Sequence, residues 1–200
     1  ADLAQALAAA GVPTVTLDFC NSRPWDGRHV QNGRDMRRVA DRLGARRVVY
    51  AGFSAGGLSA LVAAWDDPRA VGVLALDLVD DRGLGEGLAR TLRVPLLGLQ
   101  GEPAPCNAQA NGLKVFAASP RGQVLAVADA IHCDFESPTD WLCESICGGP
   151  DTGSEGRRRE VIARSVALTL GLLGLEAPTT VALPPARNQG AIAPGRGPQT

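Results

Sequence analysis

The sequence has almost no net charge and no long apolar run. Its formal net charge is −1 over 200 residues, and the basic residues are scattered arginines with Lys114 as the single lysine. This balance gives no electrostatic reason to expect a nucleic-acid partner. No apolar run reaches the roughly 18–20 residues that a transmembrane helix needs, so the sequence predicts no membrane span.

The composition predicts one folded domain. A hydrophobic content of 45% in 200 residues suits a single domain with a buried core. Beyond Glu176 the sequence becomes rich in proline, glycine, alanine and threonine, without hydrophobic periodicity. We therefore expect a domain over residues 1–176 and an extended or disordered tail over residues 177–200.

Five cysteines are many for a cytosolic domain of this size: Cys20, Cys106, Cys133, Cys143 and Cys147. They predict two disulfides and one remaining thiol in an oxidising compartment, with buried reduced thiols as the alternative. The last three lack the paired C-x2-C spacing of a structural zinc site, so a zinc protein is the less favoured reading. We expect a secreted or periplasmic protein that binds no metal and no cofactor.

Short apolar or β-branched runs alternate with helical patterns. Strand-like runs cover Val12–Phe19, Arg47–Ala51, Ala70–Leu78, Val94–Leu99, Leu113–Ala118 and Gln123–Ala128. Helices are expected over Asp2–Ala10, Gly33–Leu43, Leu58–Trp65, Gly83–Thr91 and Arg158–Leu173. Strands that are apolar throughout are typical of a parallel sheet buried on both faces. The pattern therefore predicts an α/β fold, with an open, mostly parallel sheet covered by helices on both faces.

The strongest local signal is Gly52-Phe53-Ser54-Ala55-Gly56, which fits G-x-S-x-G between an expected strand and an expected helix. Such a turn strains the serine backbone, and we expect that side chains two residues to either side would collide. The turn lifts the Ser54 hydroxyl clear of the sheet and lets the Ala55 N–H donate to a developing oxyanion. A chance match in a chain with 24 glycines is the alternative, but its place at a strand–helix junction disfavours that reading.

A serine nucleophile needs a general base, and the chain has only two histidines, His29 and His132. His29 precedes Ser54 in an expected loop over residues 20–32, whereas the order serine, acid, histidine places the base late in the chain. His132 follows the last strand-like run and is therefore the expected base.

The acid that orients the histidine has three candidates. Asp77 ends a buried strand, Asp80 lies just beyond it, and Glu102 follows the next strand. A carboxylate at the end of a buried strand is costly unless it accepts hydrogen bonds, and a histidine N–H would supply one. Asp77 is the first choice, followed by Asp80 and then Glu102.

Together these features resemble the α/β-hydrolase superfamily over about residues 1–175. Most members carry the acid after the later strand, where this chain has Gly101-Glu102-Pro103-Ala104 with Ala104 in place of the aspartate. The earlier acid is similar to that of chlorophyllases and platelet-activating-factor acetylhydrolases. The stretch Leu76-Asp77-Leu78-Val79-Asp80-Asp81 resembles the LDPVDG-like segment of chlorophyllases, with Leu78 and Asp81 replacing proline and glycine.

The resemblance implies hydrolysis of a carboxylic ester by Ser54, His132 and Asp77 through an acyl-enzyme intermediate. We expect a monomer that acts on a small-molecule or lipid ester. In this superfamily a second oxyanion donor comes from a loop ahead of the first major helix. That loop would precede Ala1, so we expect an N-terminally incomplete domain that lacks early strands. The alternatives are a weak or inactive hydrolase-fold binding protein and a zinc protein.

The cysteines near the expected base could form disulfides that hold the loop carrying His132 in place. A bond from Cys133 to Cys143 or Cys147 would pin the His132 loop, and Cys106 lies in a neighbouring loop that could join the same cluster.

Overall fold

The computed structural model describes residues 2–21, 27–139, 141–148 and 155–176. Its centre is a sheet of four parallel strands in chain order, β1 (Val48–Phe53), β2 (Ala70–Leu76), β3 (Leu96–Gln100) and β4 (Gly122–Ala126). Because the strands are parallel, their carboxyl ends meet at one edge of the sheet, where loops from different strands come together.

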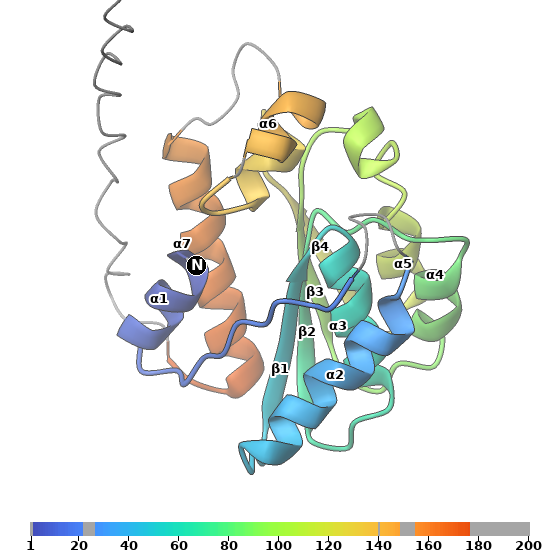
Figure 1. Ribbon diagram of the computed structural model, residues 1–200, viewed down its shortest axis with the longest axis vertical. Coiled ribbons are helices and arrows are strands. Elements are labelled where there is room, and N and C mark those ends of the chain that lie inside the picture. The colour runs from blue at the N-terminus through green and yellow to red at the C-terminus, as the bar shows by residue number, and fades with distance from the viewer. Residues whose placement is uncertain (1, 22–26, 140, 149–154, 177–200) are drawn as a thin grey trace, which may run out of the picture.

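Helices cover both faces of this sheet (Figure 1). One face carries α2 (His29–Arg42), α3 (Ala55–Trp65), α4 (Leu84–Ala89) and α5 (Leu113–Ala118), and the other carries α1 (Asp2–Ala9) and α7 (Glu155–Leu173). The short helix α6 (Trp141–Cys147) lies beyond the carboxyl ends of the strands. The predicted α/β class, with a parallel sheet covered on both faces, is confirmed. The predicted tail, residues 177–200, lies outside the described residues, and no described helix is long and apolar enough to cross a membrane.

Strand β2 shows why a strand of this sheet can be apolar at every position. Val73 and Ala75 join the core cluster on the α3 side, together with Leu58 and Leu61 of that helix. The alternate residues Leu74 and Leu76 belong to a second cluster, with Leu99 of β3 and Val161 of α7. Successive side chains of a strand point to opposite faces, so a strand covered on both sides is apolar at every position.

The run Leu113–Ala118, expected as a strand, is the helix α5, so that prediction is wrong. Its neighbouring residues Val115 and Phe116 are both buried in the same core cluster. A run of six residues, apolar except for Lys114, does not by itself distinguish a buried strand from a buried helix. Among the remaining elements, α2 begins at His29, four residues before the expected Gly33.

The expected strand over Val12–Phe19 is also absent, since these residues form no helix or strand. A strand exists only where its backbone groups pair with a neighbour, and a groove of about 790 Å³ separates this segment from β1. Val12, Thr14 and Val15 line one side of the groove, and Val49 and Tyr50 of β1 line the other. The β-branched residues of this segment therefore lie in an extended stretch of chain outside the sheet.

Candidate active site

Ser54 occupies a sharp turn between Phe53, the last residue of β1, and Ala55, the first residue of α3. Its backbone has φ 52° and ψ −124°, a strained conformation for a residue with a side chain. A Cβ atom on Gly52 would lie 2.2 Å from the carbonyl oxygen of Gly56, whereas one on Gly56 would meet nothing within 4 Å. The expected steric need for glycine is confirmed at Gly52 and wrong at Gly56.

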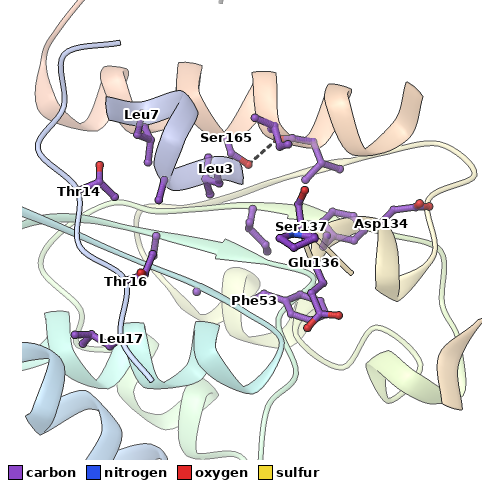
Figure 2. Close-up of a pocket in the computed structure, with 18 residues that line it drawn as sticks. Leu3, Leu7, Thr14, Thr16, Leu17, Phe53, Asp134, Glu136, Ser137 and Ser165 are labelled. Carbon is purple, nitrogen blue, oxygen red and sulfur yellow. Dashed lines mark hydrogen bonds between the residues drawn. The ribbon is translucent and has the colours of Figure 1, made fainter. Parts of the chain in front are cut away.

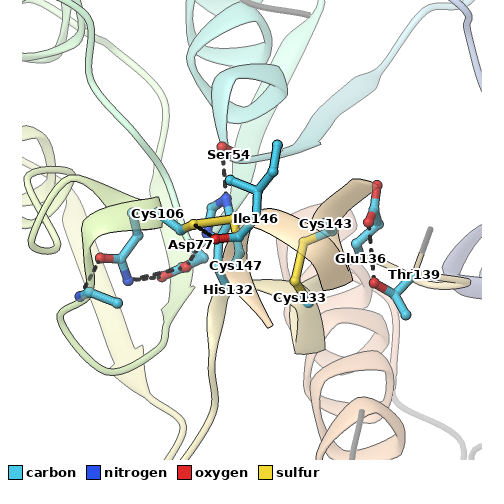
Figure 3. The surroundings of a disulfide bond; sticks show 12 residues. Ser54, Asp77, Cys106, His132, Cys133, Glu136, Thr139, Cys143, Ile146 and Cys147 are labelled. Carbon is cyan, nitrogen blue, oxygen red and sulfur yellow. Dashed lines mark hydrogen bonds and ion pairs between the residues drawn. A yellow bond between two sulfur atoms is a disulfide. The ribbon is translucent and has the colours of Figure 1, made fainter. Parts of the chain in front are cut away.

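Three side chains predicted from the sequence come together at the carboxyl edge of the sheet (Figure 3). His132 Nε2 lies 3.1 Å from Ser54 Oγ, and His132 Nδ1 lies 2.6 Å from Asp77 Oδ2. With the proton on Nδ1, the ring donates to the carboxylate and its Nε2 accepts from the hydroxyl. An imidazole held in this way can take the proton of the hydroxyl and share the resulting charge with the carboxylate.

His132 begins the short 3-10 helix η2 (His132–Phe135) and is buried. The Phe53 ring lies against its imidazole, with ring centroids 4.6 Å apart. This contact joins the residue before Ser54 to the histidine and limits the rotation of the ring. His29 lies elsewhere, at the start of α2, with Nε2 3.8 Å from a carboxylate oxygen of Asp81.

The structure distinguishes the three candidate acids. The Asp80 carboxylate accepts the backbone N–H groups of Gly85 and Glu86, at 2.6 and 3.3 Å, and so serves the first turn of α4. Glu102 is exposed, and its backbone is held by hydrogen bonds from its N–H to the Ala130 carbonyl and from Asn107 Nδ2 to its own carbonyl. Asp77 is fully buried and reaches the histidine.

Sequence reasoning missed the residues that surround Asp77. Gln100 Nε2 donates to its Oδ1, and the Gly101 N–H donates to the same oxygen at 3.0 Å. Asn107 Nδ2 lies 3.3 Å from Oδ1 and 3.2 Å from Oδ2. The signal for Gln100 is a polar residue that ends an otherwise apolar strand. Asn107 lies in the connection that follows β3, and its sequence context gives no comparable signal.

Two disulfides connect α6 to the loops around the site. Cys133 pairs with Cys143, and Cys106 pairs with Cys147, which leaves Cys20 as an exposed free thiol (Figure 3). The predicted count of two disulfides and one thiol is confirmed. One bond joins α6 to η2, which carries His132, and the other joins it to η1 (Pro105–Asn107), which carries Asn107.

The same cysteines bear on the zinc alternative. The sulfur atoms of Cys133, Cys143 and Cys147 lie within 4.8 Å of one another. A metal site needs thiolates, and these sulfurs are bonded in disulfides. The arrangement fits a cross-linked loop cluster better than a metal centre.

The backbone offers one of the two expected oxyanion donors. Ala55 begins α3, and the first N–H groups of a helix have no acceptor within the helix. Its N–H is therefore available next to the Ser54 hydroxyl. The second donor was expected from a loop ahead of the first helix, and in the described part of the chain α1 is the first element.

A cavity of about 460 Å³ lies beside Phe53, between β1 and the helices α1 and α7 (Figure 2). Its lining is mostly apolar and includes Leu3, Leu7, Phe53 and Phe135. Phe53, the residue before Ser54 in the chain, belongs to this lining, whereas Ser54 itself does not.

Comparison with known proteins adds no family assignment. No protein-family model matches the chain, and no curated protein gives a significant match. The functional argument therefore depends on the geometry of the site.

Proposed function

We propose that this chain is a serine hydrolase of the α/β-hydrolase type that cleaves carboxylic esters. The observation that carries the proposal is the hydrogen-bonded series from Ser54 Oγ to His132 Nε2, at 3.1 Å, and from His132 Nδ1 to Asp77 Oδ2, at 2.6 Å. The strained turn at Ser54 supports it, because strained backbone is concentrated at functional sites.

The reaction is an acyl transfer in two halves. His132 takes the Ser54 proton as Oγ attacks the ester carbonyl, and Asp77 stabilises the imidazolium that forms. The Ala55 N–H stabilises the oxyanion, and the imidazolium then gives its proton to the leaving alcohol. Water cleaves the acyl-enzyme by the same steps, with His132 again as the base.

The substrate is a small-molecule or lipid ester, and the reaction uses no cofactor. The two disulfides favour an oxidising compartment, so we place the protein outside the cell or in the periplasm. The apolar cavity beside Phe53 makes the acyl chain length the first substrate variable to test.

A fluorophosphonate probe tests the nucleophile directly. We expect covalent labelling at Ser54 in the wild type, none in Ser54→Ala and much less in His132→Ala. His29→Ala is the matched control, because its imidazole lies away from Ser54, and it should label as the wild type does. A panel of p-nitrophenyl esters of rising chain length then measures kcat and KM.

Failure to label would contradict the hydrolase assignment. A folded wild type that neither labels nor hydrolyses any ester of the panel would favour a hydrolase-fold binding protein. Stoichiometric zinc in the purified protein would favour the metal-binding alternative.

A further inference from the structure

The loop that follows β3 is built around Asn107, a fully buried residue that the reaction above does not use. Its Oδ1 accepts the backbone N–H groups of Ala104 and Ala110, each at 2.9 Å. Its Nδ2 donates to the Glu102 carbonyl at 2.8 Å and contacts both carboxylate oxygens of Asp77 at 3.2 and 3.3 Å. The carbonyl end of one amide thus shapes the loop, and its NH2 end faces the acid.

The loop takes a costly backbone conformation around this residue. Ala108, Gln109 and Ala110 follow one another with φ values of 50°, 57° and 55°. The left-handed conformation costs roughly 1–2 kcal/mol for each residue that is not glycine. Such a run persists only where the surrounding contacts hold it, and the bond from the Ala110 N–H to Asn107 is one of them.

Given the proposed hydrolase function, we propose that Asn107 is a positioning residue that aims Asp77 at His132. The terminal torsion of an aspartate is broad, so the carboxylate plane is fixed only by its partners. Gln100 and the Gly101 N–H hold one oxygen, Oδ1. Asn107 contacts both oxygens and so sets the plane in which Oδ2 faces His132 Nδ1. As a neutral donor it also leaves the negative charge available to the imidazolium.

Asn111, in the same loop, provides a matched control. Its Oδ1 accepts the Asp80 N–H and its Nδ2 donates to the Asp80 carbonyl, both at 2.9 Å. It therefore ties the same loop to the segment after β2 without touching Asp77. A role in holding the loop is common to both asparagines, whereas a role in aiming Asp77 belongs to Asn107 alone.

The test compares Asn107→Asp with Asn111→Asp. Each substitution keeps the Oδ1 acceptor and replaces the NH2 donor with a carboxylate oxygen, which at position 107 faces the Asp77 carboxylate and turns it away from its present plane. For p-nitrophenyl acetate we expect Asn107→Asp to lower kcat by about 100-fold with KM unchanged, as a misaligned catalytic group does. The low-field proton resonance of the hydrogen bond between His132 and Asp77 should shift or disappear. Asn111→Asp should keep the wild-type kcat and the resonance, whatever its melting temperature.

Wild-type kcat in folded Asn107→Asp, or an equal loss in Asn111→Asp, would overturn the proposal. If Asn107→Asp does not fold, Asn107→Ser replaces it under the same criteria, since its hydroxyl can accept from the Ala110 N–H. A wild type that hydrolyses no ester contradicts the proposed function instead. In that case the resonance alone decides whether Asn107 aims Asp77 at His132.

Discussion

Two buried aspartates lie on either side of β2, and their partners differ in charge. Asp67 precedes the strand, and Asp77 follows it directly. Asp67 is held by a guanidinium, since Arg69 Nε and Nη2 each donate to one of its oxygens at 2.9 Å, and by the Tyr50 hydroxyl. Among the described residues, the side-chain partners of Asp77 are two amides and one imidazole.

This difference separates a structural aspartate from one suited to catalysis. A guanidinium is charged at every working pH, so the charge of Asp67 is permanently compensated. Burial by itself tends to raise the pKa of Asp67, but hydrogen bonds from Arg69 and Tyr50 outweigh it and lower the pKa to about 2. Amides orient a carboxylate without compensating it, and the charge of Asp77 is compensated only when His132 becomes an imidazolium. Both residues are buried, so burial does not tell them apart.

The largest expected effect comes from Asp77→Asn. We expect kcat for p-nitrophenyl acetate to fall by about 10⁴-fold, because an amide neither stabilises the imidazolium nor favours the required tautomer. The equivalent change on the other side of β2, Asp67→Asn, should leave kcat of the folded protein within about threefold. Comparable losses in the two variants would remove the distinction between the aspartates.

Asp67→Asn should show its effect in stability instead. Removing one partner of a buried ion pair costs about 3–5 kcal/mol, and we expect the lower end because Arg69 also lies 2.8 Å from Asp41. Urea unfolding measures the loss. Asp41→Asn is the control, since its side chain is largely exposed and its pair with Arg69 should contribute less than about 1 kcal/mol. An equal loss of unfolding free energy in the two variants would show that the burial of Asp67 does not strengthen its ion pair with Arg69.

Lowering the pH should remove part of the stability that Asp67 contributes to the wild type. The folded-state pKa of Asp67 is lowered from 3.8 to about 2, so its contribution is complete above pH 3.8 and is lost as the pH falls towards 2. The lowered pKa corresponds to about 2 kcal/mol. In urea titrations, the stability difference between the wild type and Asp67→Asn should narrow by about that amount between pH 5 and 2. A constant difference would contradict the lowered pKa.

The parts of the fold that sequence predicts best are those set by local pattern. The run from Ala70 is apolar at successive positions, and this pattern predicts a strand that is buried on both faces. Residues 12–19 carry the composition of a strand, but pairing depends on a neighbour that local sequence does not reveal. The helix over Leu113–Ala118 was misread because its run is too short to show a period.

The site was predictable where a motif constrains it. The turn at Ser54 has a sequence signature, and chain order then left His132 as the base. The sequence alone favours Asp77 over Asp80 without excluding Asp80, because both residues follow the same strand. The Asp80 carboxylate accepts N–H groups from the first turn of α4, five and six residues further along the chain, and this local contact became evident only with the structure. Asn107 was missed for a different reason, since its contact with Asp77 spans 30 residues of chain.

The smallest effect, from Tyr50→Phe, tests whether the Tyr50 hydroxyl keeps donating to Asp67 in alkali. The substitution removes one hydrogen bond to a charged group and leaves the Arg69 pair intact, so we expect a loss of about 1.5 kcal/mol in urea unfolding and an unchanged kcat. Burial, followed by the bond to Asp67, raises the pKa of Tyr50 well above its ordinary value. The phenol therefore stays a donor, and the loss should be the same from pH 6 to pH 9. A loss that shrinks by pH 8 would mean that the phenol ionises in the folded protein and that Arg69 alone holds Asp67.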